Sequence, residues 1–261
     1  MMIQVKNLWH IYEGRKEALR GVNFEMGREI VALVGPNGSG KTTLAKHLNG
    51  LLKPTRGDVI IDGMNTKEHS VAELSKLVGY VFQNPEHMFF EESIFKEVAF
   101  GPKNLGLSPE EIEERVKWAL KKVNLKGYEE RTPYSLSGGE KQRLAIACVL
   151  SMKPKYLILD EPTTGLDERS AESVKEIIKS LYEEGHGILF ITHEMDLVLE
   201  LAQRVVLLYK GEKVFDGPTD EFFSIELRNY GLDKPELLRI SFTIGTGFVR
   251  NVEEFIGRFL R

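Results

Sequence analysis

The stretch EIVALVGPNGSGKTTLAKHL, residues 29–48, decides the fold. Its apolar start, EIVALVG, is a compact run ending in glycine, as expected of a buried parallel strand. A helix is predicted from Lys41 to about Leu51, before a Lys-Pro pair that ends it. The connection, Gly35–Thr42, follows the pattern glycine, four residues, Gly-Lys and Ser/Thr. A strand that enters a glycine-rich loop and leaves as a helix is the context that this phosphate-binding pattern requires.

The loop residues suit the phosphates of a nucleotide. Glycines let the backbone curl so that successive N–H groups point at phosphate oxygens, and the helix N-terminus adds the positive end of its dipole. Lys41 should neutralise charge on the β- and γ-phosphates of ATP, and the Thr42 hydroxyl should ligate Mg²⁺. The alternative, a glycine-rich turn with a chance lysine, is disfavoured by the flanking strand and helix. The predicted nucleotide-binding residues here are Gly35, Pro36, Asn37, Gly38, Ser39, Gly40, Lys41, Thr42 and Thr43.

Composition narrows the class of protein. The 261 residues, 42% of them hydrophobic, suffice for one large domain or for one domain with satellite lobes. A net charge of −4 gives no basic excess that would point to nucleic acid. The single Cys148 excludes an intramolecular disulfide framework and fits a reducing compartment. Without a signal-peptide pattern or a long apolar run, we expect a protein that is cytosolic or held at a membrane by another chain.

Strands and helices alternate along most of the chain, which predicts an α/β fold with a largely parallel sheet. Short strands in the first third, such as IQVKNLW and DVIIDG, are bounded by glycine, asparagine and aspartate. We expect one domain over residues 1–217, with a helical subdomain inserted at about 85–154. Residues 218–261 predict a C-terminal extension of two or three short helices.

Two carboxylates follow a second apolar strand, YLILDEP. In a parallel sheet the carboxyl ends of the strands share one edge, so this strand should end near the phosphate-binding loop. Asp160 is suited to hold Mg²⁺ through its water shell, and Glu161 can act as general base toward an attacking water. An acidic pair after a strand is more often a solvated turn. The phosphate-binding loop in the same chain favours the catalytic interpretation.

A second glycine motif, LSGGE at Leu136–Glu140, opens the helix KQRLAIACVL. Ser137, Gly138, Gly139 and Glu140 at a helix start form another anion site by the same physics, or simply an N-cap with a tight turn. The γ-phosphate of the first site is already claimed by Lys41 and its loop. A second anion site on one chain therefore suggests a nucleotide that is bound to another chain.

The order of these motifs, followed by a GLD turn and a strand-end histidine, resembles that of the ABC (ATP-binding cassette) ATPases. The resemblance runs through nearly all of residues 1 to about 217, and LSGGE is its most specific element. It implies the P-loop NTPase fold of these proteins, with a mostly parallel sheet, N-terminal antiparallel strands and an inserted helical subdomain. It also implies head-to-tail dimers, in which two ATP molecules lie between the phosphate-binding loop of one subunit and LSGGE of the other.

The resemblance assigns further roles residue by residue. Tyr12 is similar to the aromatic residue that stacks on adenine, although it could be a tyrosine that only packs in a strand. Gln83 resembles the glutamine that contacts Mg²⁺ and the attacking water and senses the membrane subunit. Asp167 resembles the residue that couples the two sites, and His193 the switch histidine on the γ-phosphate. With Glu161 present as well, the subunit should be catalytically complete.

Residues 81–108, VFQNPEHMFFEESIFKEVAFGPKNLGLS, are similar to the ATPases of energy-coupling-factor transporters and of related cobalt and nickel importers. GLDKPELLRI, residues 231–240, resembles their C-terminal segment. This implies a second ATPase subunit, identical or paralogous, a membrane scaffold and a small membrane protein that binds a vitamin or metal ion. The chain would lie on the cytoplasmic face of the cell membrane. The scaffold would present arginines to Glu86, Glu91 and Glu92, which could equally form a solvated acidic patch.

Three other functions stay open from the sequence. The QNPE, VAFGP and NLGL run disfavours an ordinary ABC importer with a soluble binding protein, and it does so only through the resemblance to the energy-coupling-factor ATPases. An ABC ATPase acting on DNA or ribosomes would carry coiled-coil insertions or a second cassette, and this chain shows neither sustained heptads nor a basic arm. An adaptor that binds ATP without turnover is disfavoured by Glu161 and His193. The solute, the identity of the second ATPase and the role of the tail after Ser241 are not determined by these residues.

Overall fold

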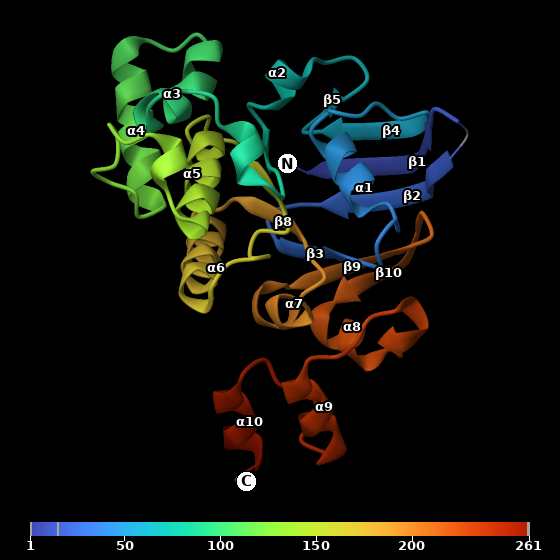
Figure 1. The fold of residues 1–261 in the computed structure, drawn as a ribbon. Coiled ribbons are helices and arrows are strands. Elements are labelled where there is room, and N and C mark those ends of the chain that lie inside the picture. Colours follow the sequence, from blue (N-terminus) through green and yellow to red (C-terminus); the bar gives the residue numbers. More distant parts are fainter. Residues whose placement is uncertain (1, 15, 260–261) are drawn as a thin grey trace.

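The computed structural model describes residues 2–14 and 16–259, and strands and helices alternate along the chain (Figure 1). The strands are β1 (Ile3–Tyr12), β2 (Lys16–Met26), β3 (Ile30–Val34), β4 (Arg56–Ile61), β5 (Met64–Asn65), β6 (Val78–Val81), β7 (Tyr156–Asp160), β8 (Gly187–Ile191), β9 (Arg204–Tyr209) and β10 (Glu212–Pro218). The α-helices are α1 (Lys41–Leu48), α2 (Val71–Leu74), α3 (Ile94–Asn104), α4 (Pro109–Lys122), α5 (Gly138–Leu150), α6 (Glu168–Glu183), α7 (Met195–Leu201), α8 (Thr219–Ser224), α9 (Glu236–Thr243) and α10 (Val252–Phe259). Three 3-10 helices are η1 (Pro85–Met88), η2 (Pro133–Ser135) and η3 (Leu227–Tyr230).

The strands form two sheets. The larger has the order β10-β9-β3-β8-β7-β6 and is parallel from β9 to β6, with β10 antiparallel at one edge. The smaller, β2-β1-β4-β5, is antiparallel throughout. A mostly parallel core with N-terminal antiparallel strands confirms the predicted fold class.

The central strand β3 separates two hydrophobic cores. Ile30 and Val34 pack on one side with the helices of the inserted lobe, whereas Val31 and Leu33 pack on the other side with the antiparallel sheet. Because side chains alternate along a strand, a strand covered on both faces needs an unbroken apolar run. The helix α1 belongs to the second core through residues such as Leu44, so it lies between the two sheets.

The helix after the glycine-rich loop is shorter than the sequence predicts. It ends at Leu48, not near Leu51. Gly50 adopts φ +77°, which a right-handed helix does not allow, and the Asn49 side chain accepts a hydrogen bond from the Leu51 N–H at 3.1 Å. A Cβ on Gly50 would lie 2.4 Å from a methyl carbon of Leu74, so the chain turns where only glycine fits.

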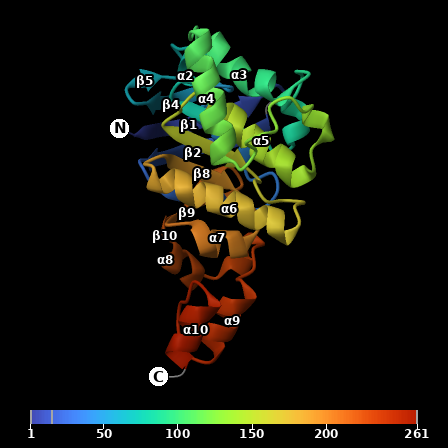
Figure 2. The same ribbon diagram turned by 90° about the vertical axis from the view of Figure 1, so that its left-hand side faces the viewer.

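The helical lobe of α3, α4 and α5 lies to one side of the two sheets (Figures 1 and 2). A capping box begins α4, where Ser108 and Glu111 bond each other's backbone N–H groups. Val116 and Leu120 of α4 are fully buried in the core that the lobe shares with the parallel sheet. The predicted domain boundaries stay a prediction, and β10 ends at Pro218, one residue beyond the first of them.

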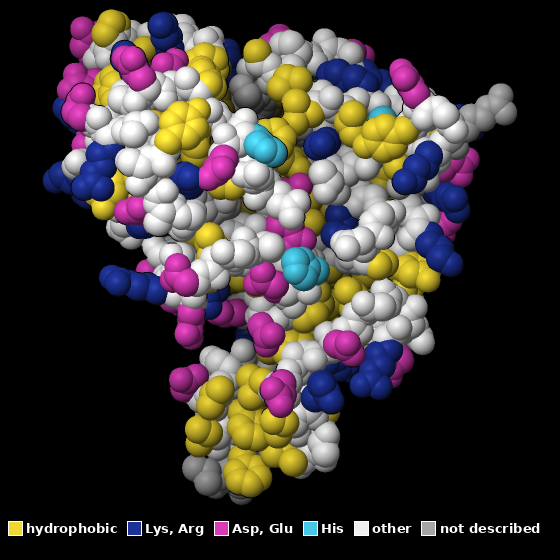
Figure 3. Space-filling view, in the orientation of Figure 1, with side chains coloured by type: hydrophobic (Ala, Val, Ile, Leu, Met, Phe, Trp, Pro, Cys, Tyr) yellow, Lys and Arg dark blue, Asp and Glu magenta, His cyan; other side chains and the backbone are white. Residues whose placement is uncertain are grey.

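In the C-terminal region, the first helix buries its large apolar side chains, whereas the last two expose many of theirs. Phe222 and Phe223 of α8 are fully buried in the core. The helices α9 and α10 and the residue that follows α9 instead expose apolar side chains, which gather at the lower end of the molecule in Figure 3 and include Ile240, Phe242, Ile244, Val252, Ile256 and Phe259. Within residues 2–14 and 16–259, no helix combines the length and the apolar character needed to cross a membrane.

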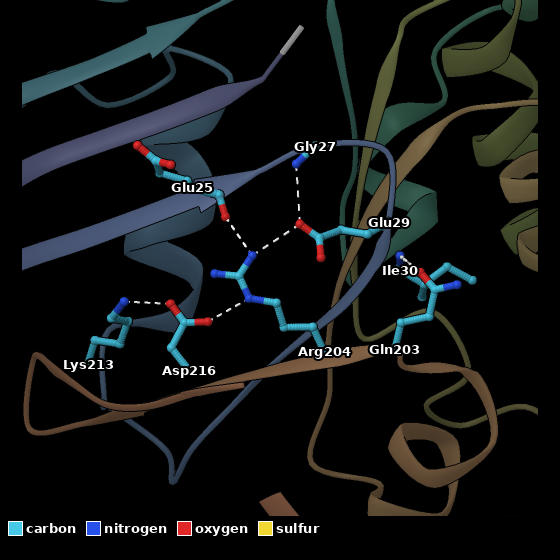
Figure 4. A network of polar contacts seen from close by, with 8 residues as sticks. All are labelled: Glu25, Gly27, Glu29, Ile30, Gln203, Arg204, Lys213 and Asp216. Atoms are coloured by element: carbon cyan, nitrogen blue, oxygen red, sulfur yellow. Dashed lines mark hydrogen bonds and ion pairs between the residues drawn. The ribbon is translucent and has the colours of Figure 1, made fainter. Parts of the chain in front are cut away.

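A polar network fixes the β9–β10 hairpin to the start of the central strand (Figure 4). The Arg204 guanidinium donates to Asp216 at 2.6 Å, to Glu29 at 3.1 Å and to the Glu25 carbonyl at 3.0 Å. Burial alone would raise the pKa of Asp216, but hydrogen bonds from Arg204 and Lys213 outweigh it and hold that pKa below its usual value. A depressed carboxylate pKa stabilises the fold above the unfolded-state pKa, and this contribution is lost as the pH falls through the folded-state pKa.

Candidate active site

The carboxyl ends of β3, β7 and β8 open into a cleft of about 1050 Å³. In a parallel sheet this edge is the usual place for a ligand. The cleft is lined by most of the site residues that the sequence predicts, namely Tyr12, Gly35, Pro36, Asn37, Gly38, Gly40, Lys41, Thr42, Thr43, Gln83, Asp160, Glu161 and His193. Chain segments that are far apart in sequence therefore meet in one depression.

The glycine-rich loop lies directly on one strand of each sheet, β9 and β2. Gly35 has φ +146°, and a Cβ there would lie 2.1 Å from the Leu208 carbonyl oxygen of β9. Gly40 has φ +107°, and its Cβ would lie 2.7 Å from the Ala18 carbonyl oxygen of β2. Both positions thus require glycine for conformation and for space. Ser39, the one predicted loop residue that does not line the cleft, is buried, and a Cβ on Gly35 would also meet its hydroxyl at 2.8 Å.

Lys41 is held inside the loop. It is 8% exposed, and its Nζ donates to the carbonyl oxygens of Gly35 at 2.7 Å and Pro36 at 3.1 Å. Burial lowers the pKa of Lys41, while the carboxylates of Glu161 and Asp160 act in the opposite direction. The helix α1 begins at Lys41 after the N-cap residue Gly40, with no side-chain cap from any described residue, so its first N–H groups can face a ligand.

Asp160 ends β7 as a nearly buried carboxylate, 5% exposed. The Tyr80 hydroxyl donates to its Oδ2 at 2.8 Å. Burial raises the pKa of Asp160, and hydrogen bonds from Tyr80 and the Thr42 hydroxyl act against this rise. Gln83, exposed and just beyond β6, lines the same cleft. An aspartate, a threonine hydroxyl and a glutamine amide therefore share one depression as oxygen donors.

Glu161 and His193 form a pair across two neighbouring strands. The Glu161 carboxylate lies 3.0 Å from Nδ1 of His193 and accepts a hydrogen bond from the Thr164 hydroxyl at 2.9 Å. The Glu161 backbone has φ +52°, which is uncommon for a residue with a side chain, and its N–H donates to the Ile191 carbonyl at 3.0 Å. Strain of this kind persists only where the surroundings fix it, and it gathers at functional sites.

Tyr12 ends β1 and presents an exposed ring to the cleft, with 41% of the residue accessible. Its hydroxyl lies 3.1 Å from Oγ1 of Thr43, in the first turn of α1. A ring that is fixed at its tip and open on one face can stack on a planar ligand. Adenine stacking by Tyr12 remains a prediction.

The LSGGE residues and Asp167 do not line this cleft. They cap two helices that approach each other closely. Ser137 and Glu140 form a capping box at the start of α5, and Asp167 caps α6 by accepting from the Ser170 N–H at 2.9 Å. A Cβ on Gly139 would lie 2.4 Å from the Ser170 hydroxyl oxygen, so Gly139 permits this contact between the helices. Gly138, beside it, begins α5.

The structure adds residues that sequence reasoning did not single out. Glu194 accepts hydrogen bonds from the hydroxyls of Thr163 at 3.0 Å and Thr164 at 3.2 Å, and so holds the turn that follows Glu161. In the sequence, the position of Glu194 directly after His193 could have marked it as a candidate site residue. Further lining residues of the cleft come from β2, from the end of β8 and the start of α7, and from the segment before and at the start of α9; they are Lys16, Glu17, Ala18, Ile191, Glu194, Met195, Asp196, Gly231, Leu232, Asp233, Lys234, Pro235 and Glu236.

Comparison with known proteins identifies the family. The family model described as ABC transporter matches residues 19–164, more than half of the chain. The chain belongs to the ABC transporter family. A Pyrococcus horikoshii protein with the provisional name ABC transporter ATP-binding protein is 59% identical to this ABC ATPase over 98% of both chains. The predicted family and fold are confirmed, and so is the prediction of an enzyme that binds and hydrolyses ATP.

Two further relatives bear on the kind of transporter. The energy-coupling factor transporter ATP-binding protein EcfA of Methanothermobacter thermautotrophicus is 47% identical, over 85% of this ABC ATPase and 72% of the relative. Among solved structures, cbiO1 of Clostridium perfringens, part of the ABC transporter complex cbiONQ, is 33% identical with a TM-score of 0.80, over 93% of this chain and 98% of that one. A dimeric ATP-binding cassette bound to ADP and Pi has a TM-score of 0.75 at 30% identity, over 83% of this chain and 98% of that one.

Proposed function

We propose that this ABC ATPase powers an importer of the energy-coupling-factor type, through ATP-driven closure of a dimer. The main support for ATP hydrolysis at this site is that Lys41, Asp160 and the Glu161–His193 pair converge in one cleft. The likeness to EcfA and to cbiO1 supports the transporter type. The solute class follows from that type and is a vitamin or a transition-metal ion, bound by another subunit.

ATP would lie along the cleft with its phosphates in the glycine-rich loop. Lys41 and the N–H groups at the start of α1 supply positive charge and donors to the phosphate oxygens. Tyr12 offers its exposed ring face to the adenine. Because the loop is fixed against β2 and β9, these donors keep their positions when the nucleotide enters.

The donors in the cleft fit Mg²⁺. The ion prefers hard oxygen ligands, few protein carboxylates and substrate phosphates. Asp160, the Thr42 hydroxyl and the Gln83 amide oxygen are such donors, and the buried Asp160 gains most from a nearby cation because burial disfavours its charge. When bound, the ion would neutralise charge that develops on the β- and γ-phosphate oxygens.

Hydrolysis would use Glu161 as general base. Its carboxylate accepts a proton from a water while the water oxygen bonds to the γ-phosphorus and the bond from that phosphorus to the β-phosphate oxygen breaks. The products are ADP and phosphate. His193 and Thr164 hold the two carboxylate oxygens of Glu161 and so aim it into the cleft. Gln83, which is exposed beside β6 and lines the cleft, would orient the water and respond to a membrane subunit.

The LSGGE residues would act on the ATP of a second subunit. Ser137 and the first N–H groups of α5 form an anion-binding helix end that lies outside the cleft of their own chain. Asp167, at the start of the adjacent α6, would couple the two sites. A second copy or a paralogue, placed head to tail, would bring this helix end over the nucleotide.

Ser137→Ala is expected to weaken ATP-driven dimerisation by about tenfold, the effect of one lost hydrogen bond to a charged group. The comparison is Ser108→Ala, since Ser108 forms an equivalent capping box at the start of the neighbouring helix α4. Each variant loses a helix cap worth about 1 kcal/mol, but only Ser137 would contact nucleotide. Light scattering with ATP measures the dimer. Equal weakening in both variants would assign the effect to helix stability alone.

The contact with the membrane scaffold would involve η1 and the start of α3. Glu86 is exposed and forms an ion pair with Lys141, and Glu92 pairs with Lys96. Surface pairs of this kind contribute little to stability, so an arginine of the scaffold could replace Lys141 or Lys96 as the partner of the glutamate at low cost. Glu91 lies between them and is half-buried. The chain would be held at the cytoplasmic face of the cell membrane through this surface.

Purification of the tagged chain from membranes in mild detergent tests the transporter type. We expect a scaffold membrane protein and small substrate-binding membrane proteins to co-purify, identified by mass spectrometry. Recovery of two large membrane subunits would favour an ordinary ABC importer. Recovery of ribosomes or DNA-bound proteins alone would refute transport and leave the ATPase activity standing.

A further inference from the structure

Two buried histidines lie beneath the ring that we propose for adenine stacking. His10 of β1 is 8% exposed and His47 of α1 is fully buried. The His10 ring meets the Tyr12 ring edge to face, with centroids 4.4 Å apart at 80°, and meets the His47 ring at 4.7 Å and 74°. Both distances and angles are typical of favourable aromatic pairs. The rings of Tyr12, His10 and His47 thus form a continuous series of edge-to-face contacts from the cleft into the core, and this series is called the stack.

The stack joins the proposed adenine side of the nucleotide site, at Tyr12, to the phosphate side, at α1. His47 Nδ1 lies 2.7 Å from the Thr43 carbonyl oxygen, which can only accept, so Nδ1 carries the proton. The Tyr12 hydroxyl contacts Oγ1 of the same Thr43. Thr43 lies in the first turn of α1, directly after the phosphate-binding residues. The ring of Tyr12 is therefore tied to that helix both directly and through the two histidines.

The two histidines act through the shape of their rings and not through charge. Burial lowers the pKa of His47 to about 4, although its hydrogen bond to the Thr43 carbonyl opposes the shift, and burial also lowers the pKa of His10. Both rings are consequently neutral at neutral pH. Among the described residues, the His10 nitrogens and His47 Nε2 have no partner of hydrogen-bond geometry. Buried ring nitrogens without partners are costly, which calls for a gain elsewhere.

We propose that His10 is a positioning residue for ATP: it supports the Tyr12 ring and, through His47, fixes that ring relative to the phosphate-binding helix. This inference rests on the proposed stacking of Tyr12 on adenine. The pairing of β1 with β2 is irregular on both sides of His10, so the contact with the His10 ring adds to the pairing of Tyr12 with Lys16 in fixing the direction of Tyr12. The stack sets the distance between the base and the phosphates before ATP arrives, so less conformational freedom is lost on binding.

His10→Leu tests the proposal, because leucine keeps a buried apolar side chain but removes the aromatic ring. We expect KM for ATP to rise about tenfold, equivalent to 1.4 kcal/mol of binding, with kcat within about twofold of wild type. His10→Phe should restore KM, since phenylalanine keeps the edge-to-face contact. Inhibition by tripolyphosphate, which has no base, should be the same in all three proteins. His47→Leu should raise KM in the same way and provides the test if His10→Leu does not fold.

His186→Ala is the control variant. It removes a histidine whose pKa is also lowered by burial but which lies outside the cleft. His186 is half-buried just before β8, at the amino end of the strand and away from the carboxyl-end cleft, and its Nδ1 also lacks a described partner. Thermal unfolding can fall in this variant, but KM for ATP should not change. An equal rise of KM in His10→Leu and His10→Phe, or weaker tripolyphosphate inhibition in His10→Leu, would overturn the proposal, because either result assigns the effect to packing of α1.

Tyr12→Ala tests the adenine contact of Tyr12, on which the proposed role of His10 rests. If Tyr12→Ala leaves KM unchanged, the adenine contact of Tyr12 is wrong and the proposal falls with it. If Tyr12→Ala raises KM and His10→Leu does not, the adenine contact stands and His10 has no positioning role. We expect the double variant to be no worse than Tyr12→Ala alone, because His10 acts only through the Tyr12 ring.

Discussion

Glu161→Gln is expected to lower kcat for ATP hydrolysis by about 10²–10⁴-fold, the usual contribution of a general base. Glutamine has the same size and still has an oxygen that can accept from the Thr164 hydroxyl, but it does not accept the proton of the attacking water. ATP binding should be retained, because Lys41 and the glycine-rich loop are unchanged. Phosphate release measures the rate, and light scattering should reveal an ATP-bound dimer that persists without turnover.

Glu194→Gln is the matched comparison for this variant. Glu194 also lines the cleft and accepts hydrogen bonds from Thr163 and Thr164, so the substitution removes a neighbouring carboxylate without removing the proposed base. We expect its kcat to fall less than about tenfold, as for a residue that only supports Glu161. Hydrolysis by Glu161→Gln at nearly the wild-type rate would show that another group accepts the proton.

Gly35→Ala is expected to abolish ATP binding and to destabilise the fold by about 3 kcal/mol or more. The new Cβ would meet the Leu208 carbonyl oxygen at 2.1 Å, and the backbone at φ +146° is unfavourable for alanine. Leu208 belongs to β9, whose next residue toward the amino end pairs with Val34, so neither side of this contact can move without disturbing the sheet. Denaturant unfolding measures the stability, and fluorescence titration with an ATP analogue measures the binding.

Gly38→Ala separates steric from conformational causes within the same loop. Gly38 has φ +77°, and its Cβ would meet nothing within 4 Å among the described atoms. We expect a loss of about 1–2 kcal/mol, from the left-handed backbone alone. If both variants lose the same stability, the close approach of the loop to β9 is not what fixes its conformation.

Local chemistry made much of this protein predictable from its sequence. The apolar run before Gly35, the glycine-rich loop and the helix after it depend on residues that are neighbours in the chain. The capping boxes at Ser108 and Ser137 are likewise formed within three residues. Helix termini, turns and strand alternation are short-range properties, so such elements could be placed before any contact was known. The end of α1 was misplaced although its cause is also local, because Gly50 adopts φ +77° and Asn49 accepts from the Leu51 N–H.

Pairings between distant residues were decided by the tertiary structure. The sequence indicated Glu161 and His193 as separate strand-end residues, but the adjacency of β7 and β8 is what brings them to 3.0 Å. The stack of Tyr12, His10 and His47 exists only because the antiparallel sheet packs on α1.

The sequence by itself therefore determined the family and most of the elements, and it indicated the chemical groups of the candidate site. The tertiary structure decided which side chains meet, such as Gly139 with Ser170 or Glu194 with Thr163. The physical reason is that a motif is set by short-range backbone preferences, whereas a contact between distant residues depends on strand order and packing, which the whole chain settles together.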